Sequence, residues 1–138
     1  MQKIILDTNV IVSALTSNSV PTSILYDLVF KQMVTPCLSK EIFEEYVEVL
    51  GRDKFNRFVG FKSKSDVVLT KLKEISKLYQ TEGKIEILTD VSDNKFLKLA
   101  AASSADYLIT GNALDFTITE FEYTKIVTPR QYWDNHRP

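Results

Sequence analysis

The stretch Lys3-Ile4-Ile5-Leu6-Asp7-Thr8-Asn9-Val10-Ile11-Val12-Ser13-Ala14-Leu15 decides the fold. Its first four residues form a short aliphatic run, which is typical of a strand buried on both faces of a parallel sheet. From residue 10 onwards the apolar side chains recur at helical spacing, so a helix is predicted to follow at once. Asp7 therefore stands at the carboxyl end of the first strand.

The same alternation of strands and helices continues along the chain. Further strands are predicted at residues 33–35, 85–88, 107–110 and 125–128, and further helices at residues 21–29, 40–50, 63–80 and 93–103. This order is typical of an α/β fold, a three-layer α/β/α sandwich with a central parallel sheet. We predict a single domain over residues 1–138, because the sequence contains neither a repeat nor a linker.

Acidic side chains follow several of the predicted strands. In parallel α/β sheets, ligands bind beyond the carboxyl ends of the strands, and this rule selects Asp7 and the turns that hold Asp90, Asp93 and Asp115. A single Asp after a strand is more often a helix N-cap than a ligand. One of Asp90 and Asp93 is expected to cap the following helix in either interpretation.

The composition excludes several other kinds of protein. The 17 Lys and Arg nearly cancel the 18 Asp and Glu, so the net charge of -1 gives no global attraction to nucleic acid or an anionic membrane. The four glycines are too scattered for a nucleotide-binding loop. Cys37 is the one cysteine and His136 the one histidine of the sequence, which disfavours disulfide, thiol and serine-hydrolase chemistry.

The longest uncharged stretch, residues 8–26, is too polar to span a bilayer, so we expect a cytoplasmic protein without membrane contact.

Carboxylates are the side chains that remain for chemistry. Several carboxylates held within a few ångströms repel one another unless a cation neutralises them. Oxygen ligands without His or Cys select Mg²⁺ or Mn²⁺ over Zn²⁺ or copper. A Mg²⁺ ion held in this way keeps bound waters and can activate one of them for attack on a phosphodiester. The acids therefore predict a Mg²⁺ or Mn²⁺ site.

One predicted helix can add a further carboxylate. Residues 40–50 carry glutamates at positions 41, 44, 45 and 48, and such a run is usually a solvated face. Glu45 borders the apolar stripe beside Tyr46, whereas Glu44 and Glu48 point further away. Glu45 is therefore the glutamate expected to reach the sheet edge.

Four stretches of the chain resemble the four motifs of PIN domains, in the same order and along essentially the whole chain. The stretches are residues 5–14, 39–50, 90–101 and 108–116. In the second motif, the metal-site glutamate of the family falls on Glu45. In the third motif, the step from Asp93 to Ala100 matches the Asp-to-Ala spacing of the family.

The resemblance implies a PIN-like fold and a Mg²⁺- or Mn²⁺-dependent endoribonuclease, and it points to the toxins of VapC-type toxin-antitoxin systems. It also implies a homodimer and a small cognate antitoxin that blocks the site. The catalytic and metal-binding residues that it implies are Asp7, Glu45, Asp93 and Asp115, and the supporting residues are Thr8, Asn9, Asp90, Thr110 and Asn112.

The fourth motif departs from the family pattern. Many PIN domains have an acid at the position of Asn112, and the nearest acid here is Asp115, three residues later. Either residue is a candidate to complete the metal site.

The segment between residues 52 and 77 is basic, with eight Lys or Arg against three Asp or Glu, and it includes Phe55, Phe58 and Phe61. Basic side chains could neutralise RNA phosphates, and an exposed aromatic ring could stack on a base. The alternative is a solvated helix face over a core of Phe. Single-stranded or looped RNA is the expected substrate, because sequence-specific cleavage needs splayed bases.

Two other functions compete with the nuclease. A catalytically inactive, RNA- or protein-binding PIN-like regulatory module would explain Asn112 as a lost ligand. A phospho-acceptor receiver domain is disfavoured, because it needs an acidic pair after the first strand and Asp7 stands alone there.

Overall fold

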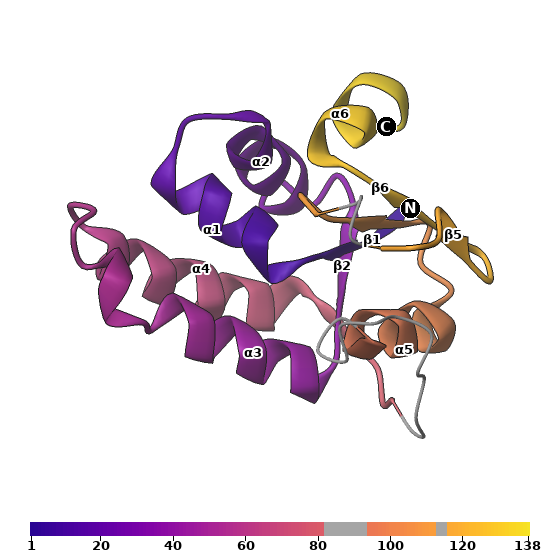
Figure 1. Ribbon diagram of the computed structural model, residues 1–138, viewed down its shortest axis with the longest axis horizontal. Helices are drawn as coiled ribbons and strands as arrows, with labels where there is room; N and C mark the ends of the chain where they lie inside the picture. The colour runs from indigo at the N-terminus through magenta and orange to yellow at the C-terminus, as the bar shows by residue number, and fades with distance from the viewer. Residues whose placement is uncertain (82–93, 113–115) are drawn as a thin grey trace.

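A computed structural model describes residues 1–81, 94–112 and 116–138 of the chain. The strands form one sheet in the order β3-β2-β1-β4-β6-β5. They are β1 (Lys3–Leu6), β2 (Thr35–Leu38), β3 (Lys77–Leu78), β4 (Tyr107–Ile109), β5 (Glu120–Phe121) and β6 (Thr124–Val127). The helices are α1 (Thr8–Thr16), α2 (Val20–Ser23), α3 (Lys40–Leu50), α4 (Phe61–Ile75), α5 (Asn94–Ser103) and α6 (Pro129–Asn135), with a π-helix η1 (Ile24–Val29) and a 3-10 turn η2 (Asp53–Phe55). Helices α2 and α6 lie over one face of the sheet and α5 over the other (Figure 1). The predicted three-layer α/β/α sandwich is confirmed.

Strand β1 forms the centre of the sheet. It pairs in parallel with β2 on one side and with β4 on the other, and Leu6 lies opposite Ile109. Ile4 and Ile5 are completely buried, as expected for a strand covered on both faces. The carboxyl ends of β1 and β4 therefore lie side by side in the sheet.

The centre of the sheet is parallel, as predicted, and the sheet is mixed because one edge strand runs the other way. Strand β5 runs antiparallel to β6, with Glu120 opposite Lys125. Only Glu122 and Tyr123 connect the two strands, and so short a connection can only return the chain antiparallel. Glu122 adopts the left-handed backbone of this turn, with φ of 52°. The sequence has no glycine there to indicate a hairpin.

Strand β2 lies two residues later than predicted, because Pro36 lies inside the strand and does not end it. The Thr35 N–H donates to the carbonyl of Gln2, on the β1 side, at 2.8 Å. The Pro36 nitrogen therefore faces the other side, where pairing with β3 begins only at Cys37. A proline is tolerated at this position since no ladder hydrogen bond is lost there.

Helix α4 also begins and ends earlier than predicted. It starts after Gly60, whose φ of 72° lies in the left-handed region, so Ser63 lies inside the helix and not at its N-cap. It ends at Ile75, because the chain then forms the edge strand β3. The predicted strand at residues 85–88 lies outside the described residues.

The C-terminal strand ends one residue earlier than predicted, and the helix after it was not predicted. The hydroxyl of Thr128 accepts a hydrogen bond from the Gln131 N–H at 3.1 Å and so caps α6. Tyr132 of this helix is completely buried against the ring of Tyr107.

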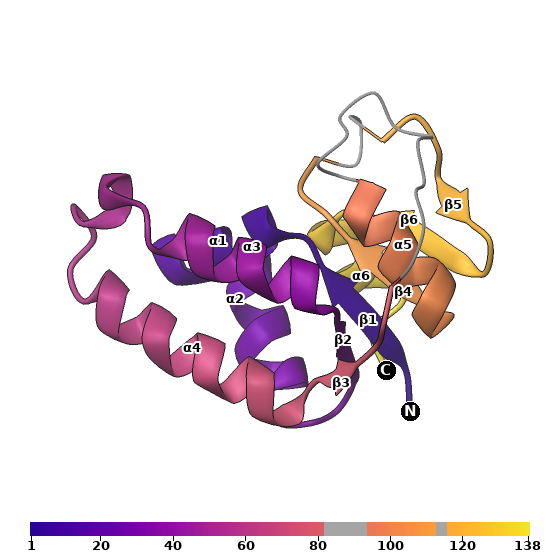
Figure 2. The same cartoon turned by 90° about the horizontal axis from the view of Figure 1, so that it is seen from below.

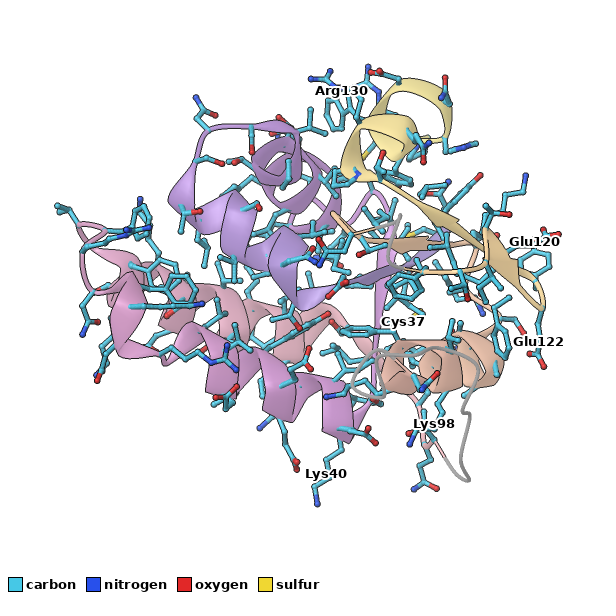
Figure 3. All side chains as sticks on the ribbon, in the orientation of Figure 1. Cys37, Lys40, Lys98, Glu120, Glu122 and Arg130 are labelled. Atoms are coloured by element: carbon cyan, nitrogen blue, oxygen red, sulfur yellow. The ribbon has the colours of Figure 1, made fainter. Side chains whose placement is uncertain are left out.

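Helices α3 and α4 run side by side and extend away from the sheet as a hairpin (Figure 2). Buried Cys37 lies near the middle of the molecule, and Glu120 and Glu122 lie at the far end of the β5–β6 hairpin (Figure 3). None of the helices in the described part of the chain is long and apolar enough to cross a membrane.

Helix α3 is tied to the central strand by Tyr46, which is fully buried and donates its hydroxyl to the carbonyl of Leu6. We expect Tyr46→Phe to lower the free energy of unfolding in urea by about 1–3 kcal/mol, because the buried carbonyl loses its donor. Tyr123→Phe is the control, since the Tyr123 hydroxyl binds Asp106 at an exposed position. Equal losses in the two variants would contradict the assigned role of Tyr46.

Candidate active site

Asp7 lies directly between β1 and α1 and is only 6% exposed. It occupies the N-cap position of α1, yet its side chain makes no capping hydrogen bond. The carboxylate instead accepts hydrogen bonds from the hydroxyl of Thr110 at 2.6 Å and from the amide of Asn9 at 3.4 Å. The fold thus directs this carboxylate away from the cap and towards the loop that follows β4.

The loops after β1 and β4 are bound to each other. The Asp7 N–H donates to the carbonyl of Ile109 at 2.9 Å, and the Gly111 N–H donates to the side-chain oxygen of Asn9 at 3.1 Å. The hydroxyl of Thr110 also accepts from the N–H of Asn112 at 3.1 Å. The structure therefore brings Asn9, Thr110 and Asn112 together around Asp7.

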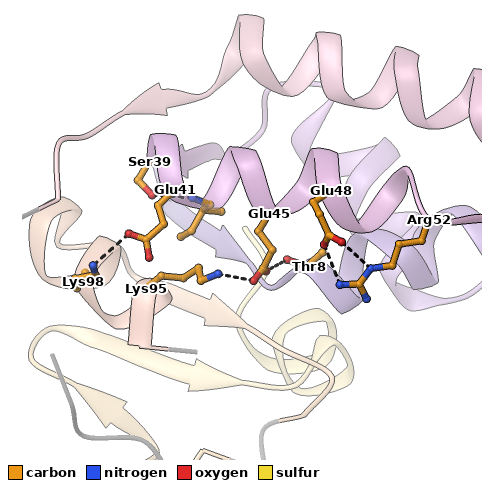
Figure 4. Close-up of polar contacts among 9 residues, drawn as sticks. Thr8, Ser39, Glu41, Glu45, Glu48, Arg52, Lys95 and Lys98 are labelled. Carbon is orange, nitrogen blue, oxygen red and sulfur yellow. Dashed lines mark hydrogen bonds and ion pairs between the residues drawn. The ribbon is translucent and has the colours of Figure 1, made fainter. Parts of the chain in front are cut away.

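Glu45 reaches the same region from α3. One carboxylate oxygen accepts a hydrogen bond from the hydroxyl of Thr8, and the other is 2.7 Å from the ammonium of Lys95 in α5 (Figure 4). The Glu45 side chain is 19% exposed, whereas those of Glu44 and Glu48 are more than half exposed. Among the glutamates of α3, Glu45 is the one that contacts both α1 and α5.

The two carboxylates influence each other electrostatically. Burial raises the pKa of Asp7, the hydrogen bond from Thr110 opposes that rise, and the negative charge of Glu45 adds to it. A buried carboxylate with a second one nearby is stabilised by a bound cation, and the donors are all oxygens. The residues present therefore fit a hard divalent cation such as Mg²⁺ or Mn²⁺.

Three of the predicted site residues, Asp90, Asp93 and Asp115, lie outside the described residues. Within residues 1–81, 94–112 and 116–138, no group of three or more His, Cys, Asp or Glu side chains is arranged to hold a metal ion. Of the four predicted metal-binding acids, the structure therefore describes Asp7 and Glu45.

A family model described as PIN domain matches residues 3–114. The chain belongs to the PIN domain family. PIN domains are generally nucleases, which supports a nuclease or hydrolase reaction.

A relative of this PIN domain is the uncharacterized protein MJ1680 of Methanocaldococcus jannaschii. The two sequences are 31% identical over 111 residues, which cover 80% of this chain and 70% of the relative.

The basic segment of this PIN domain divides into a buried and an exposed part. Phe55 and Phe61 are buried and stack on each other with ring centroids 4.8 Å apart, so they belong to the core. Phe58 is half-buried, and the guanidinium of Arg57 lies 4.9 Å from its ring centroid. Of these three rings, Phe58 is the one still accessible to a ligand.

Lys95 is a contact of the candidate site that the sequence analysis missed. Lys95 and Lys98 are three residues apart on α5, and they pair with Glu45 and Glu41, which are four residues apart on α3. Both spacings place the side chains on one helix face. These matching spacings are a signal that the sequence contains, but nothing in it shows that the two helices are neighbours.

The raised pKa of Asp7 predicts how stability depends on pH without metal. The folded state binds the Asp7 proton more tightly than the unfolded chain does, so the stability from this group increases as pH falls from 7 towards the unfolded pKa, about 3.9. In EDTA at pH 7, we expect Asp7→Asn to melt about 3–5 °C higher than the wild type, and this difference should shrink as the pH falls.

Asp27→Asn is the control for this melting series, because Asp27 is exposed and pairs with Lys31 four residues away. It should melt like the wild type at every pH. A lower melting temperature for Asp7→Asn at pH 7 would mean that the site favours the ionised Asp7 even without metal.

Proposed function

We propose that this PIN domain is a metal-dependent endoribonuclease that cleaves single-stranded or looped RNA. The observation that carries the proposal is the approach of two carboxylates, Asp7 and Glu45, at the carboxyl end of the central strand. Such a pair in a nuclease family supports metal-assisted phosphodiester hydrolysis.

The residues that would hold a Mg²⁺ or Mn²⁺ ion are Asp7, Glu45, Asp93 and Asp115. When bound, such an ion lowers the pKa of a water ligand and neutralises charge that develops on the phosphate. The support for this ion, and against zinc, is the donor chemistry of carboxylate oxygens without His or Cys.

Two threonines hold the described acids in place. The Thr110 hydroxyl donates to Asp7, and the Thr8 hydroxyl donates to Glu45. Because Thr8 follows Asp7 in the chain, one turn of backbone at the start of α1 positions both acids. Fixed carboxylates have little reorganisation left to undergo when substrate arrives, which favours catalysis.

The α3–α4 hairpin supports a single-stranded substrate. Arg57 and Phe58 at its end offer a cation for a phosphate and a ring for a base. Glu45 lies six residues before Gly51, the C-cap of α3, or about 9 Å along the helix axis. An RNA strand lying along α3 would therefore run from the acidic pair towards this end.

The cellular role that we propose is that of a cytoplasmic toxin in a toxin-antitoxin pair. In this role the protein acts as a homodimer, and a small cognate antitoxin blocks the acidic site. The support is the resemblance of the four motifs to those of PIN domains, which points to the toxins of VapC-type systems.

Cleavage of RNA by the purified protein tests the proposed function. The wild type should cut a single-stranded RNA in the presence of Mg²⁺ and leave DNA of the same sequence intact. Asp7→Asn and Asp93→Asn should lower the rate by more than about 100-fold, because a lost ligand costs more than a lost supporting contact. No cleavage by the wild type on any single-stranded RNA would favour the inactive binding module instead.

A matched pair of variants tests the role of Glu45 within this assay. Glu45→Gln should be nearly as damaging as Asp7→Asn, whereas Glu44→Gln, at an exposed position on the same helix, should have little effect. Equal damage from the two changes would mean that α3 supplies a different glutamate.

The fourth ligand is tested by the Mg²⁺ dependence of the cleavage rate. We propose that Asp115 supplies the fourth carboxylate and that Asn112 orients water or phosphate as a neutral donor. Asp115→Asn should then raise the Mg²⁺ concentration for half-maximal activity by roughly 10-fold, and Asn112→Ala by less. The opposite order would assign the ligand to Asn112.

A further inference from the structure

Two ion pairs connect α5 to α3 in neighbouring helix turns. The ammonium of Lys95 lies 2.7 Å from a carboxylate oxygen of Glu45, and that of Lys98 lies 3.2 Å from a carboxylate oxygen of Glu41 (Figure 4). Both pairs join the same two helices with the same chemistry. They differ in what surrounds the acid.

The Lys95–Glu45 pair is the more enclosed one. The two side chains are 17% and 19% exposed, whereas Glu41 is 46% exposed beside Lys98. Glu45 also accepts a hydrogen bond from the hydroxyl of Thr8, whereas Glu41 accepts one from Lys98. Among the described residues, Lys95 is the basic side chain that pairs with Glu45.

The charge of Glu45 needs a partner at this position. Its carboxylate is largely removed from water and acts on the buried carboxylate of Asp7, whose charge has the same sign. A partly buried charge is costly unless an opposite charge neutralises it. Within the part of the chain that the structure describes, the Lys95 ammonium supplies that opposite charge.

An ammonium and a divalent cation on one carboxylate would repel each other strongly, because both would lie within hydrogen-bond or ligand distance of the same carboxylate group. We propose that Lys95 is the built-in counter-cation of Glu45 and that a divalent cation displaces its ammonium from Glu45 on binding. This inference rests on the metal-dependent function proposed above. It makes Lys95 a competitor that sets the cation concentration at which the site fills.

Calorimetric titration of the chelator-treated protein with MgCl₂ and with MnCl₂ tests the exchange without any RNA. Lys95→Gln should bind either ion about five- to tenfold more tightly than the wild type, the gain expected from removing one competing ion pair. Lys98→Gln is the matched control and should bind like the wild type. Lys95→Arg keeps the charge and should also bind like the wild type.

Melting in EDTA tests whether Lys95 neutralises Glu45 when no metal is bound. Without Lys95, Glu45 lacks its counter-charge, so Lys95→Gln should melt lower than Lys98→Gln when metal is absent. Saturating Mg²⁺ should raise the melting temperature of Lys95→Gln more than that of the wild type.

A measurement on the wild type covers the case in which Lys95→Gln does not fold. In protein labelled with ¹⁵N-lysine, Mg²⁺ should shift or broaden the ammonium resonance of Lys95 and leave that of Lys98 in place. A Lys95 resonance unchanged at saturating Mg²⁺ would show that the ion pair persists and would overturn the exchange.

The outcomes separate this inference from the proposed function. Wild-type metal binding that Lys95→Gln weakens or leaves unchanged would overturn the role of Lys95 and leave the metal centre standing. Absence of binding in the wild type and all three variants would overturn the metal centre, and the exchange with it. Tighter binding by Lys95→Gln in a protein that cleaves no RNA would support the exchange and overturn the nuclease.

Discussion

A buried carboxylate at the end of the central strand is the constraint on which the candidate site depends. Strand β1 is covered on both faces, so the residue that follows it cannot turn its side chain freely to solvent. Burial disfavours the charged form of Asp7. The hydroxyl of Thr110 and the side-chain amide of Asn9 donate hydrogen bonds to the Asp7 carboxylate and so offset part of this cost. Asn9 also accepts a hydrogen bond from Gly111, which connects the loop after β4 to the start of α1.

Helix α3 meets this strand end through two consecutive residues. Tyr46 donates to the carbonyl of Leu6, and Glu45 accepts from Thr8, so the helix is bound on both sides of Asp7. A shift of α3 would therefore break the buried hydrogen bond of Tyr46 and at the same time move the carboxylate of Glu45. The packing of the core and the position of the acid are linked in this way. The ion pair of Glu45 with Lys95 extends the same linkage to α5.

Local patterns in the sequence predict most of this fold, and its exceptions have physical causes. The aliphatic run before Asp7, the apolar stripe of α3 and the acid after the first strand are all visible in neighbouring residues. Pro36 was expected to end a strand, but whether a proline can stay in a strand depends on which neighbour its nitrogen faces. The hairpin at Glu122 lacks the usual glycine. Lys95 could not be assigned to the site, because only the tertiary structure brings α5 beside α3.

In the proposed function, the α3–α4 hairpin separates the residues that would recognise the substrate from the acids that would take part in the reaction. Its far end, residues 51–60, carries Arg57 and Phe58 and lies well beyond the sheet (Figure 2). Glu45 is held by Thr8 at the start of α1 and by Lys95 of α5, so its position does not depend on the length of that end. If the proposed function holds, insertions or deletions at the end of the hairpin would change how far the protein reaches along a bound strand and leave the acidic pair in place. Selection could then alter the choice of target without rebuilding the acidic site.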